Sequence, residues 1–232
     1  MKKIIIVGPL PPPYYGLSVA TEVILRSQHR KRFEFIHLDT SDSRQELNFG
    51  KFDLGNIYFS LKNIFKLFWM LVWHRPHIVY IPISQGFLGY IRDAAFIYLS
   101  AFWKAKIVLH LRGGYFRTFY QNSLFPVKWL ISNSISLAER MIVLGESMRS
   151  IFDGLFPAEK LCVVPNGVDP DRFELRCQGL EKNGRVRVCF LSNLYSTKGY
   201  METLKAVERL ASSYNVEVVF AGEWGSSTEK ER

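Results

Sequence analysis

The sequence is poor in cysteine and has no long apolar run, and both absences narrow the kind of protein it encodes. Its three cysteines, Cys162, Cys177 and Cys189, are odd in number and show no C-x-x-C spacing. We therefore expect inert or buried thiols in a reducing cytoplasm. No stretch approaches the ~18 uninterrupted apolar residues of a membrane span. The opening "MKKIIIVGPL" has the lysines of a signal peptide, but its short, β-branched apolar run favours a buried strand.

A nucleic-acid-binding motif is also missing, although the chain is basic. The formal net charge is +9, and basic residues crowd together between positions 26 and 32. Recognition of nucleic acid needs a known motif or an aromatic platform in addition to such charge. We therefore expect no nucleic acid partner, and instead phosphorylated ligands or an anionic lipid surface. The 232 residues, 48% of them hydrophobic, suit a globular protein of one or two domains.

Continuous apolar runs alternate with segments of helical period, which predicts an α/β fold with a parallel sheet covered on both faces. The helix after the first strand is expected to pack through Ala20, Val23, Ile24 and Ser27. The expected strands of the first domain are Lys3–Val7, Phe33–Leu38, Ile78–Ile81, Ile107–Leu111, Met141–Leu144 and Leu161–Val164.

Two domains joined by a linker are expected. Residues 1–168 form a Rossmann-like first domain, and 169–184, with Asn-Gly turn signals, form the linker. Residues 185–232 then supply one βαβ unit, with strands Arg187–Leu191 and Val216–Ala221 around helix Tyr200–Ser212. A parallel strand pair needs more strands and helices to cover its faces. We therefore expect this unit to be incomplete and the chain to be a fragment.

Ligands of open α/β sheets bind at the carboxyl ends of the strands, and the loop after the first strand is unusual. It reads "GPLPPPYYGLSVAT", in which three prolines stiffen the turn and Gly16 lets a ligand approach the backbone. The helix that follows can accept a phosphate oxygen at its N-terminus. The loop lacks the G-x-G-x-x-G spacing of dinucleotide oxidoreductases. Asp39, after the second strand, is better explained as a turn residue.

Polar residues follow two further strands of the first domain. "HLRGG" places His110 and Arg112 before Gly113 and a second glycine, which suits a polar ligand approached by backbone. For His110 a purely structural role at the strand end stays equally open. In "LGESMRS", Glu146 and Ser147 begin a helix, and their capping positions explain both without a ligand.

In the second unit, "SNLYSTKGY" follows the first strand. Lys198 lies at the start of a helix, where the macrodipole disfavours a cation unless the two share an anion, and Gly199 lets that anion come close. We expect a phosphate site there. The "DPD" of Asp169–Asp171 imitates a D-x-D metal site but follows a turn, so a connector is favoured and no metal ion is expected.

Read together, these stretches resemble a family 4 glycosyltransferase with the GT-B fold, of the bacterial capsule or lipopolysaccharide type, truncated in its C-terminal domain. The stretches that carry the resemblance are "GPLPPPYYGLSVAT", "SQGFLGYIRDAAFIYLSAFWKAKIVLHLRGGYFRTFY", "MIVLGESMRSIF", "VVPNGVD" and "CFLSNLYSTKG". The resemblance implies two Rossmann-like domains facing across a cleft, the first holding the acceptor and the second the nucleotide-sugar.

The resemblance also implies roles for single residues. Gly16 would lie against the donor phosphates, His110 would contact the transferred sugar, and Lys198 would hold the diphosphate. Asn166 and Gly167 would mark the crossing between domains. Asn193 stands where many relatives have arginine, so part of the usual pyrophosphate clamp is either absent or supplied by other residues. The family's E-x7-E stretch has no counterpart here.

The resemblance thus implies a hexosyltransferase that moves a sugar from a nucleotide-sugar to a glycan or lipid-linked acceptor, with retention of configuration and without a cofactor. Positive charge and helix dipoles would stabilise the departing diphosphate. We expect it in the cytoplasm or at the inner face of the cell membrane, and inactive as this chain alone. Two alternatives stay open: a nucleotide-sugar epimerase of the same fold, and an inactive module that binds acceptor or membrane.

A membrane contact is expected at the helical segment Ile57–Trp73. Lysines and tryptophans on one stripe suit a headgroup region, although a neighbouring helix or domain covering the tryptophans explains them equally well. The residues of this stripe are Lys62, Lys66, Trp69 and Trp73. The opposite face, expected to be buried, consists of Ile57, Leu61, Ile64, Phe68 and Leu71.

Overall fold

The computed structural model describes residues 1–12, 14–41, 54–167, 185–194, 198–222 and 224. The chain divides into two compact units, Met1–Val168 and Asp169–Arg232. Each unit is described by itself below. The Asp169–Asp171 motif and Cys177 lie outside the described residues.

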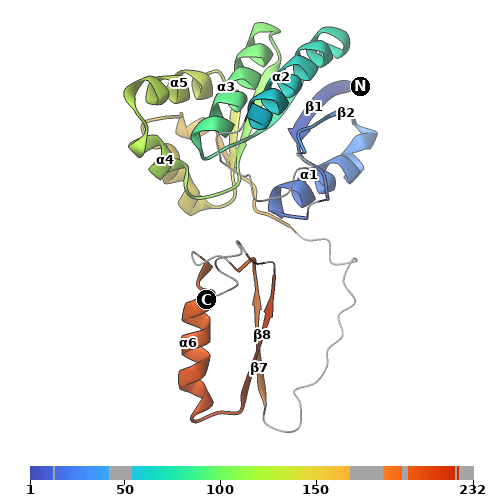
Figure 1. Cartoon of the computed structure of the whole chain (residues 1–232). Coiled ribbons are helices and arrows are strands. Elements are labelled where there is room, and N and C mark those ends of the chain that lie inside the picture. Colours follow the sequence, from blue (N-terminus) through green and yellow to red (C-terminus); the bar gives the residue numbers. More distant parts are fainter. Residues whose placement is uncertain (13, 42–53, 168–184, 195–197, 223, 225–232) are drawn as a thin grey trace. The chain divides into compact units, whose positions relative to one another are not determined.

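The first unit is built on a parallel sheet of six strands in the order β2-β1-β3-β4-β5-β6 (Figure 1). The strands are β1 (Lys2–Gly8), β2 (Phe33–Asp39), β3 (Ile78–Ile83), β4 (Lys106–Leu111), β5 (Arg140–Val143) and β6 (Leu161–Val163). Each matches an expected strand to within two residues at either end. The α/β class and the parallel sheet predicted from the apolar runs are confirmed.

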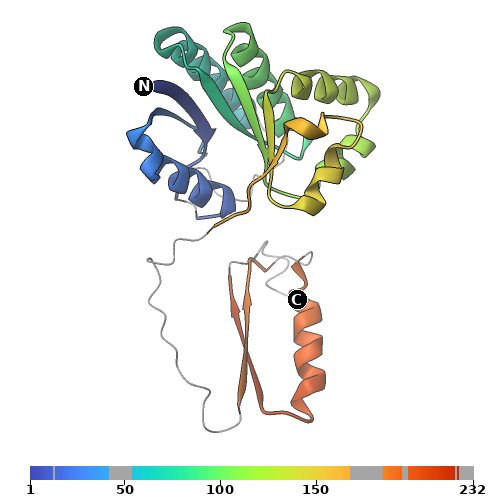
Figure 2. The same cartoon turned by 180° about the vertical axis from the view of Figure 1, so that it is seen from behind.

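Helices cover both faces of this sheet, in a division set by the handedness of the crossovers. From β1 to β2 the chain moves across the sheet in one direction, and from β2 onward it moves in the opposite direction. Right-handed crossovers therefore place α1 on one face and α2, α3 and α5 on the other. These three helices lie side by side in both views (Figures 1 and 2). The helices are α1 (Gly16–Arg26), α2 (Leu54–His74), α3 (Phe87–Phe102), α4 (Phe116–Asn122) and α5 (Phe125–Ser136). Short 3-10 turns are η1 (Gln28–Lys31), η3 (Glu146–Phe152) and η4 (Ala158–Lys160).

One hydrophobic core joins the sheet to the layer of α2, α3 and α5. Strand side chains such as Ile5, Ile81 and Leu109 are fully buried, because a parallel strand is apolar on both faces. Phe96 of α3 and Ile135 of α5 pack into the same cluster. This core holds the carboxyl ends of the strands in fixed positions.

The packing faces of two helices differ from those expected. On α2 the expected face is right for Leu71, which is fully buried, and for Ile64, which packs against the core. It is wrong for Leu61, which is 61% exposed, and for Ile57, which is also exposed. Leu67, which was not on the expected face, is fully buried. The helix is apolar almost all round, so its composition leaves several faces able to pack against the sheet.

On α1 the buried side chains are Ser18 and Thr21, whereas Val23 is exposed. The reason is a close approach between the start of α1 and the end of β1, which only small side chains allow. A Cβ atom at Gly8 would lie 2.7 Å from Thr21 Oγ1.

The second unit contains β7 (Val186–Leu191), α6 (Tyr200–Ala211) and β8 (Val216–Ala221), with the two strands parallel. The expected βαβ unit is confirmed. Leu191 and Val219 of its sheet are exposed in this unit. Of the described cysteines, Cys162 is half-buried and Cys189 is exposed, and both are free thiols. Of the two expected states, buried or inert, burial is therefore wrong for Cys189.

The contact between Gly8 and Thr21 predicts a specific coupling. We expect Gly8→Ala to lower the free energy of unfolding by about 1–3 kcal/mol, because the added methyl group overpacks this junction. In the Gly8→Ala/Thr21→Ala double variant the loss should be smaller than the sum of the two single losses. Urea unfolding followed by tryptophan fluorescence measures this, since four of the five tryptophans lie in the first unit. Gly114→Ala is the control, because a Cβ atom there meets nothing within 4 Å; strict additivity would contradict the contact.

Candidate functional site

The polar residues singled out in the first unit gather at one edge of its sheet. All six strands are parallel, so the loops that follow them leave from the same edge. Gly16, Arg112, Gly113 and Glu146 all lie on these loops or at the helix starts that follow. The candidate site is therefore this carboxyl edge.

The loop after β1 is held to the loop after β2. The backbone N–H of Leu10 donates to Ser41 Oγ at 3.0 Å, and Asp39 accepts from the N–H of Ser41 at 2.8 Å. Asp39 therefore has the turn role that the sequence favoured. Gly16 is the first residue of α1 and is exposed, and a Cβ atom there would meet nothing within 4 Å. The packing of the chain itself does not require a glycine at this position.

His110 lies within β4 and is only 4% exposed. Its Nδ1 is 2.7 Å from the hydroxyl oxygen of Tyr80 on the neighbouring strand β3. Its Nε2 is buried and has no hydrogen-bond partner among the described residues. Burial, and then the nearby charge of Arg112, lower the pKa of His110 to about 3, so the imidazole is neutral at physiological pH. With Tyr80 donating to Nδ1, the proton stays on Nε2, which can donate to a ligand oxygen.

Arg112 follows β4 and links it to the loop after β6. Its guanidinium donates to Asn166 Oδ1 at 2.9 Å, while its Nε is buried without a partner among the described residues. Its positive charge also acts on Tyr80 and opposes the rise that burial causes in the pKa of that phenol. Arg112 therefore lies next to the His110–Tyr80 pair, and a ligand reaches Nε2 of His110 only if this edge opens.

Gln85, in the loop after β3, explains why position 113 is a glycine. A Cβ atom at Gly113 would collide with the Gln85 amide, and Gln85 Oε1 accepts from the N–H of Tyr115 at 2.6 Å. In this structure the space beside Gly113 is thus filled by the chain's own side chain. A ligand approaching the backbone here must move Gln85 aside.

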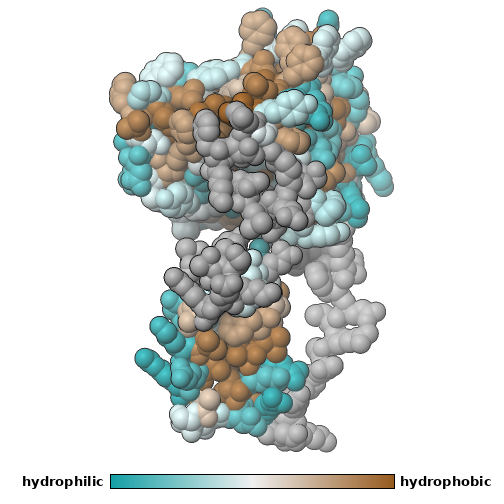
Figure 3. Space-filling model, in the orientation of Figure 1, coloured by the Kyte–Doolittle hydropathy of each residue, from teal (hydrophilic) through white to brown (hydrophobic). Residues whose placement is uncertain are grey.

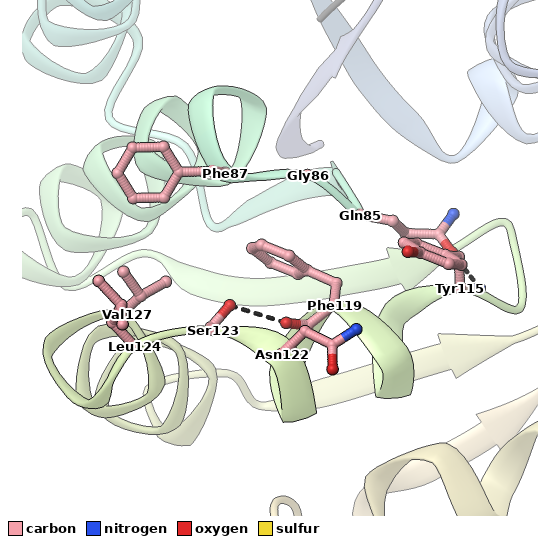
Figure 4. Close-up of a pocket in the computed structure, with 9 residues that line it drawn as sticks. All are labelled: Gln85, Gly86, Phe87, Tyr115, Phe119, Asn122, Ser123, Leu124 and Val127. Atoms are coloured by element: carbon pink, nitrogen blue, oxygen red, sulfur yellow. Dashed lines mark hydrogen bonds between the residues drawn. The ribbon is translucent and has the colours of Figure 1, made fainter.

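A cavity of about 450 Å³ opens beside this amide (Figure 4). Gln85 and Tyr115 lie at one end of it, and Phe87, Leu124 and Val127 lie at the other, with Phe119 between them. Asn122 and Ser123 complete the lining. The cavity therefore combines apolar walls with amide groups that can bind hydroxyls.

Glu146 and Ser147 begin η3, directly after β5. Both are exposed, and Glu146 pairs with Arg149 at 3.7 Å. An acid in the first turn of a helix is favourable by itself. The structure brings these two residues to the carboxyl edge but shows no contact between them and His110 or Arg112.

In the second unit, Lys198 and Gly199 directly precede α6, as expected. Lys198 is exposed, and Gly199 is the N-cap with φ of 80°, a backbone conformation that suits glycine. Glu202 in the first turn of α6 places a carboxylate near this N-terminus. Asn193 is exposed in the loop after β7. These residues therefore present a helix N-terminus and a cation at one end of this unit.

Sequence reasoning missed Tyr80 and Gln85. Tyr80 lies inside an apolar run, and only strand register places it beside His110. Gln85 follows the same strand, and its position after a strand was the available signal. The described residues contain no group of three His, Cys, Asp or Glu side chains able to hold a metal ion, and none of the described helices is long and apolar enough to cross a bilayer.

The sequence matches no protein-family model and no curated protein. Solved structures do resemble the chain. One is MnaA of S. aureus with UDP, at 16% identity and a TM-score of 0.58, where the match covers all of this chain and 64% of that one. Another is a putative UDP-N-acetylglucosamine 2-epimerase from Listeria monocytogenes, at 13% identity and a TM-score of 0.62, covering 100% and 65%.

A third is a UDP-N-acetylglucosamine 2-epimerase, at 12% identity and a TM-score of 0.52, covering 94% and 62%. The chain thus spans less than two-thirds of the length of each of these proteins. The fold is of the GT-B type. At these identities the likeness extends to the Rossmann-like fold alone.

The buried, neutral His110 predicts a pH dependence of stability. Its pKa is lower in the folded chain than in the unfolded one, so between about pH 3 and 6.5 the unfolded chain binds more protons. Stability is therefore lost as the pH falls through this range, by about 2 kcal/mol between pH 8 and pH 5. Urea unfolding at both pH values measures this loss. In His110→Asn, whose amide can still bond Tyr80, the pH 5 loss should shrink by that amount; an unchanged loss would contradict a neutral buried imidazole.

Proposed function

We propose that this chain belongs to a glycosyltransferase of the family 4 type, which moves a hexose-type unit from a nucleotide-sugar to a glycan or lipid-linked acceptor in cell-surface polysaccharide synthesis. The GT-B type fold and the ordered stretches of resemblance support this proposal. The observation that carries it is the cavity at the carboxyl edge of the first unit.

This cavity suits the acceptor of a transfer reaction. Its lining joins aromatic side chains, Phe87, Tyr115 and Phe119, to the amides of Gln85 and Asn122. Aromatic rings pack against the apolar faces of sugars or against a lipid, while amides bind sugar hydroxyls. An epimerase acts on one nucleotide-sugar and needs no second binding site. A separate cavity at the carboxyl edge therefore favours transfer over epimerisation.

The proposed donor contacts are Lys198, Gly199 and Asn193 in the second unit and Gly16 in the first. A cation and the free N–H groups of a helix N-terminus would stabilise the charge that develops on the departing diphosphate. No nucleophilic side chain is assigned to the reaction, which proceeds with retention of configuration. Neither a cofactor nor a metal ion has a part in the proposal.

The proposed sugar and acceptor contacts are His110, Arg112, Gly113, Glu146 and Ser147. Because the imidazole of His110 is neutral, it acts as a hydrogen-bond donor to the transferred sugar through Nε2 and not as a proton carrier. The positive charge of Arg112 would attract the negatively charged donor. Tyr80 is a positioning residue, because its hydroxyl group holds the ring of His110 through Nδ1.

A nucleotide-sugar epimerase is the second candidate. Its support is that the solved structures described above with TM-scores over 0.5 include two named as UDP-N-acetylglucosamine 2-epimerases, one of them putative. The two candidates differ in one measurable property: an epimerase converts UDP-N-acetylglucosamine without any acceptor, whereas a transferase does not.

The acceptor cavity predicts a selective kinetic effect. In an intact version of the enzyme, with UDP-sugars as donors and lipid-linked glycans as acceptors, Asn122→Ala should raise the KM for acceptor about tenfold and leave the KM for donor unchanged, since one hydrogen bond to a sugar hydroxyl is lost. Transfer is followed by mass spectrometry of the glycan. Gln121→Ala is the matched control, because Gln121 is its exposed neighbour on α4 and does not line the cavity. Acceptor-free epimer formation in the same assay, seen by NMR, would replace the first candidate by the second.

The donor site predicts a difference between two lysines of the second unit. Lys198→Ala should weaken binding of UDP about tenfold or more, because the cation at the helix N-terminus is lost. Lys205→Ala, an exposed lysine within α6, should leave binding unchanged. Titration calorimetry with UDP measures both. Equal weakening in the two variants would mean that overall charge, and not a phosphate site, attracts the nucleotide.

A further inference from the structure

The positive charge of the chain is concentrated in one long segment. Between Asp53 and Glu139 the sequence contains nine lysines and arginines and a single acid, Asp93. This segment alone has a net charge of +8, against +9 for the whole chain. It comprises α2, α3, α4 and α5, and therefore the whole helical layer on one face of the first unit.

The one acid in this segment does not reach the surface. Asp93 is 1% exposed, accepts from the N–H of Ser84 at 2.7 Å and pairs with Arg92 at 2.7 Å. Its charge is therefore used inside the fold, at the junction of β3 and α3. Residues 54–138 consequently present basic side chains to solvent and no carboxylate.

Aromatic side chains form a connected cluster on the same layer. We call it the aromatic patch, and it consists of Phe65, Phe68, Trp69 and Trp73 of α2 with Phe102 and Trp103 at the end of α3. The contact between Phe68 and Trp103, with centroids 6.1 Å apart, joins the two helices. Trp73 is 74% exposed and Phe102 is 79% exposed. Figure 3 shows apolar side chains gathered over this helical layer.

Basic side chains border the aromatic patch. Lys62 and Lys66 are exposed on α2, and at 3.6 residues per turn they share the stripe of Trp69 and Trp73. Arg75 and Lys104 follow the ends of α2 and α3, with φ of 45° and 57°. Glycine fits this left-handed position at lower cost, although a cation there also interacts well with the helix dipole. Aromatic and cationic groups thus alternate along one surface.

The combination of exposed aromatic and basic side chains is suited to an anionic bilayer surface. Tryptophan and phenylalanine enter the boundary between headgroups and acyl chains, while lysine and arginine remain at the phosphates. Anionic lipid attracts each basic residue near the surface. A partner protein with acidic patches could use the charge, but the exposed rings form a ridge along α2, which suits the plane of a membrane.

We propose that the outer face of α2 and the end of α3, the aromatic patch with its bordering basic residues, docks on an anionic lipid bilayer. The proposal extends beyond the sugar chemistry and does not depend on it. The occupant is the lipid surface itself, which holds α2 in its plane.

The test is flotation of the whole chain with vesicles of phosphatidylcholine, with and without about 30% phosphatidylglycerol, at low and high salt. We expect binding to the anionic vesicles, little binding to the neutral ones, and release at high salt. Tryptophan emission should shift to shorter wavelength on binding, because Trp69, Trp73 and Trp103 belong to the patch. Brominated lipids should quench this emission.

Two variants with matched controls locate the surface. Lys62→Gln/Lys66→Gln should weaken anionic-vesicle binding about tenfold or more, and Trp73→Ser should reduce the emission shift. Lys205→Gln/Arg209→Gln, exposed on α6, should change neither. All these side chains lie at the surface, and unchanged thermal unfolding of each variant shows that it folds.

Several outcomes would overturn the proposal. These are equal binding to neutral and anionic vesicles, no binding at low salt, or full binding by the Lys62→Gln/Lys66→Gln variant. A DNA duplex that binds as tightly and gives the same emission shift would point to general attraction of polyanions instead. UDP binding is measured on the same variants. If the docking proposal alone is wrong, UDP binding stays intact, and this result distinguishes it from failure of the sugar-nucleotide proposal.

Discussion

The right-handed crossover between parallel strands is the constraint on which the first unit depends. In a parallel sheet the chain enters every strand at the same edge, so every loop that follows a strand starts at the opposite edge of the sheet. The same constraint sends α2, α3 and α5 to one face, because β2, β3, β4 and β5 follow one another in a single direction after β1. One topological rule thus creates both a polar edge and an outer helical surface.

At the polar edge, burial and charge decide what the side chains can do. His110 is buried next to a guanidinium, and both factors lower its pKa. Because protonating the buried imidazole costs free energy, His110 lacks the proton-transfer role that a surface histidine would have. It remains a fixed hydrogen-bonding group. Tyr80 fixes the ring through Nδ1, and Nε2 has no hydrogen-bond partner within the part of the chain that the structure describes. An unpaired buried nitrogen is costly, so a ligand that satisfies it gains that free energy.

The sequence predicted the strands well and the contacts poorly, for one physical reason. Buried parallel strands are continuous apolar runs that end at polar turns, so β1 and β4 were found to within one residue at each end. The contacts of His110 with Tyr80, and of Arg112 with Asn166, join residues 30 and 54 positions apart. They depend on strand register, which no local pattern encodes. The expected face of α2 was wrong in part for another reason. Its apolar residues encircle the helix, so the expected face included Leu61 and not Leu67, although of these two only Leu67 is buried.

Helix α3 connects the cavity at the carboxyl edge with the aromatic patch. Phe87 at its start lines the cavity, and Phe102 at its end belongs to the aromatic patch. At 1.5 Å per residue these two positions lie roughly 22 Å apart along the helix axis. The exposed side chains of α2 extend from Tyr58 to Trp73, a similar length, so docking through them would lay α2 flat along the bilayer. The cavity, at the far end of α3, then lies beside the docked surface and not beneath it.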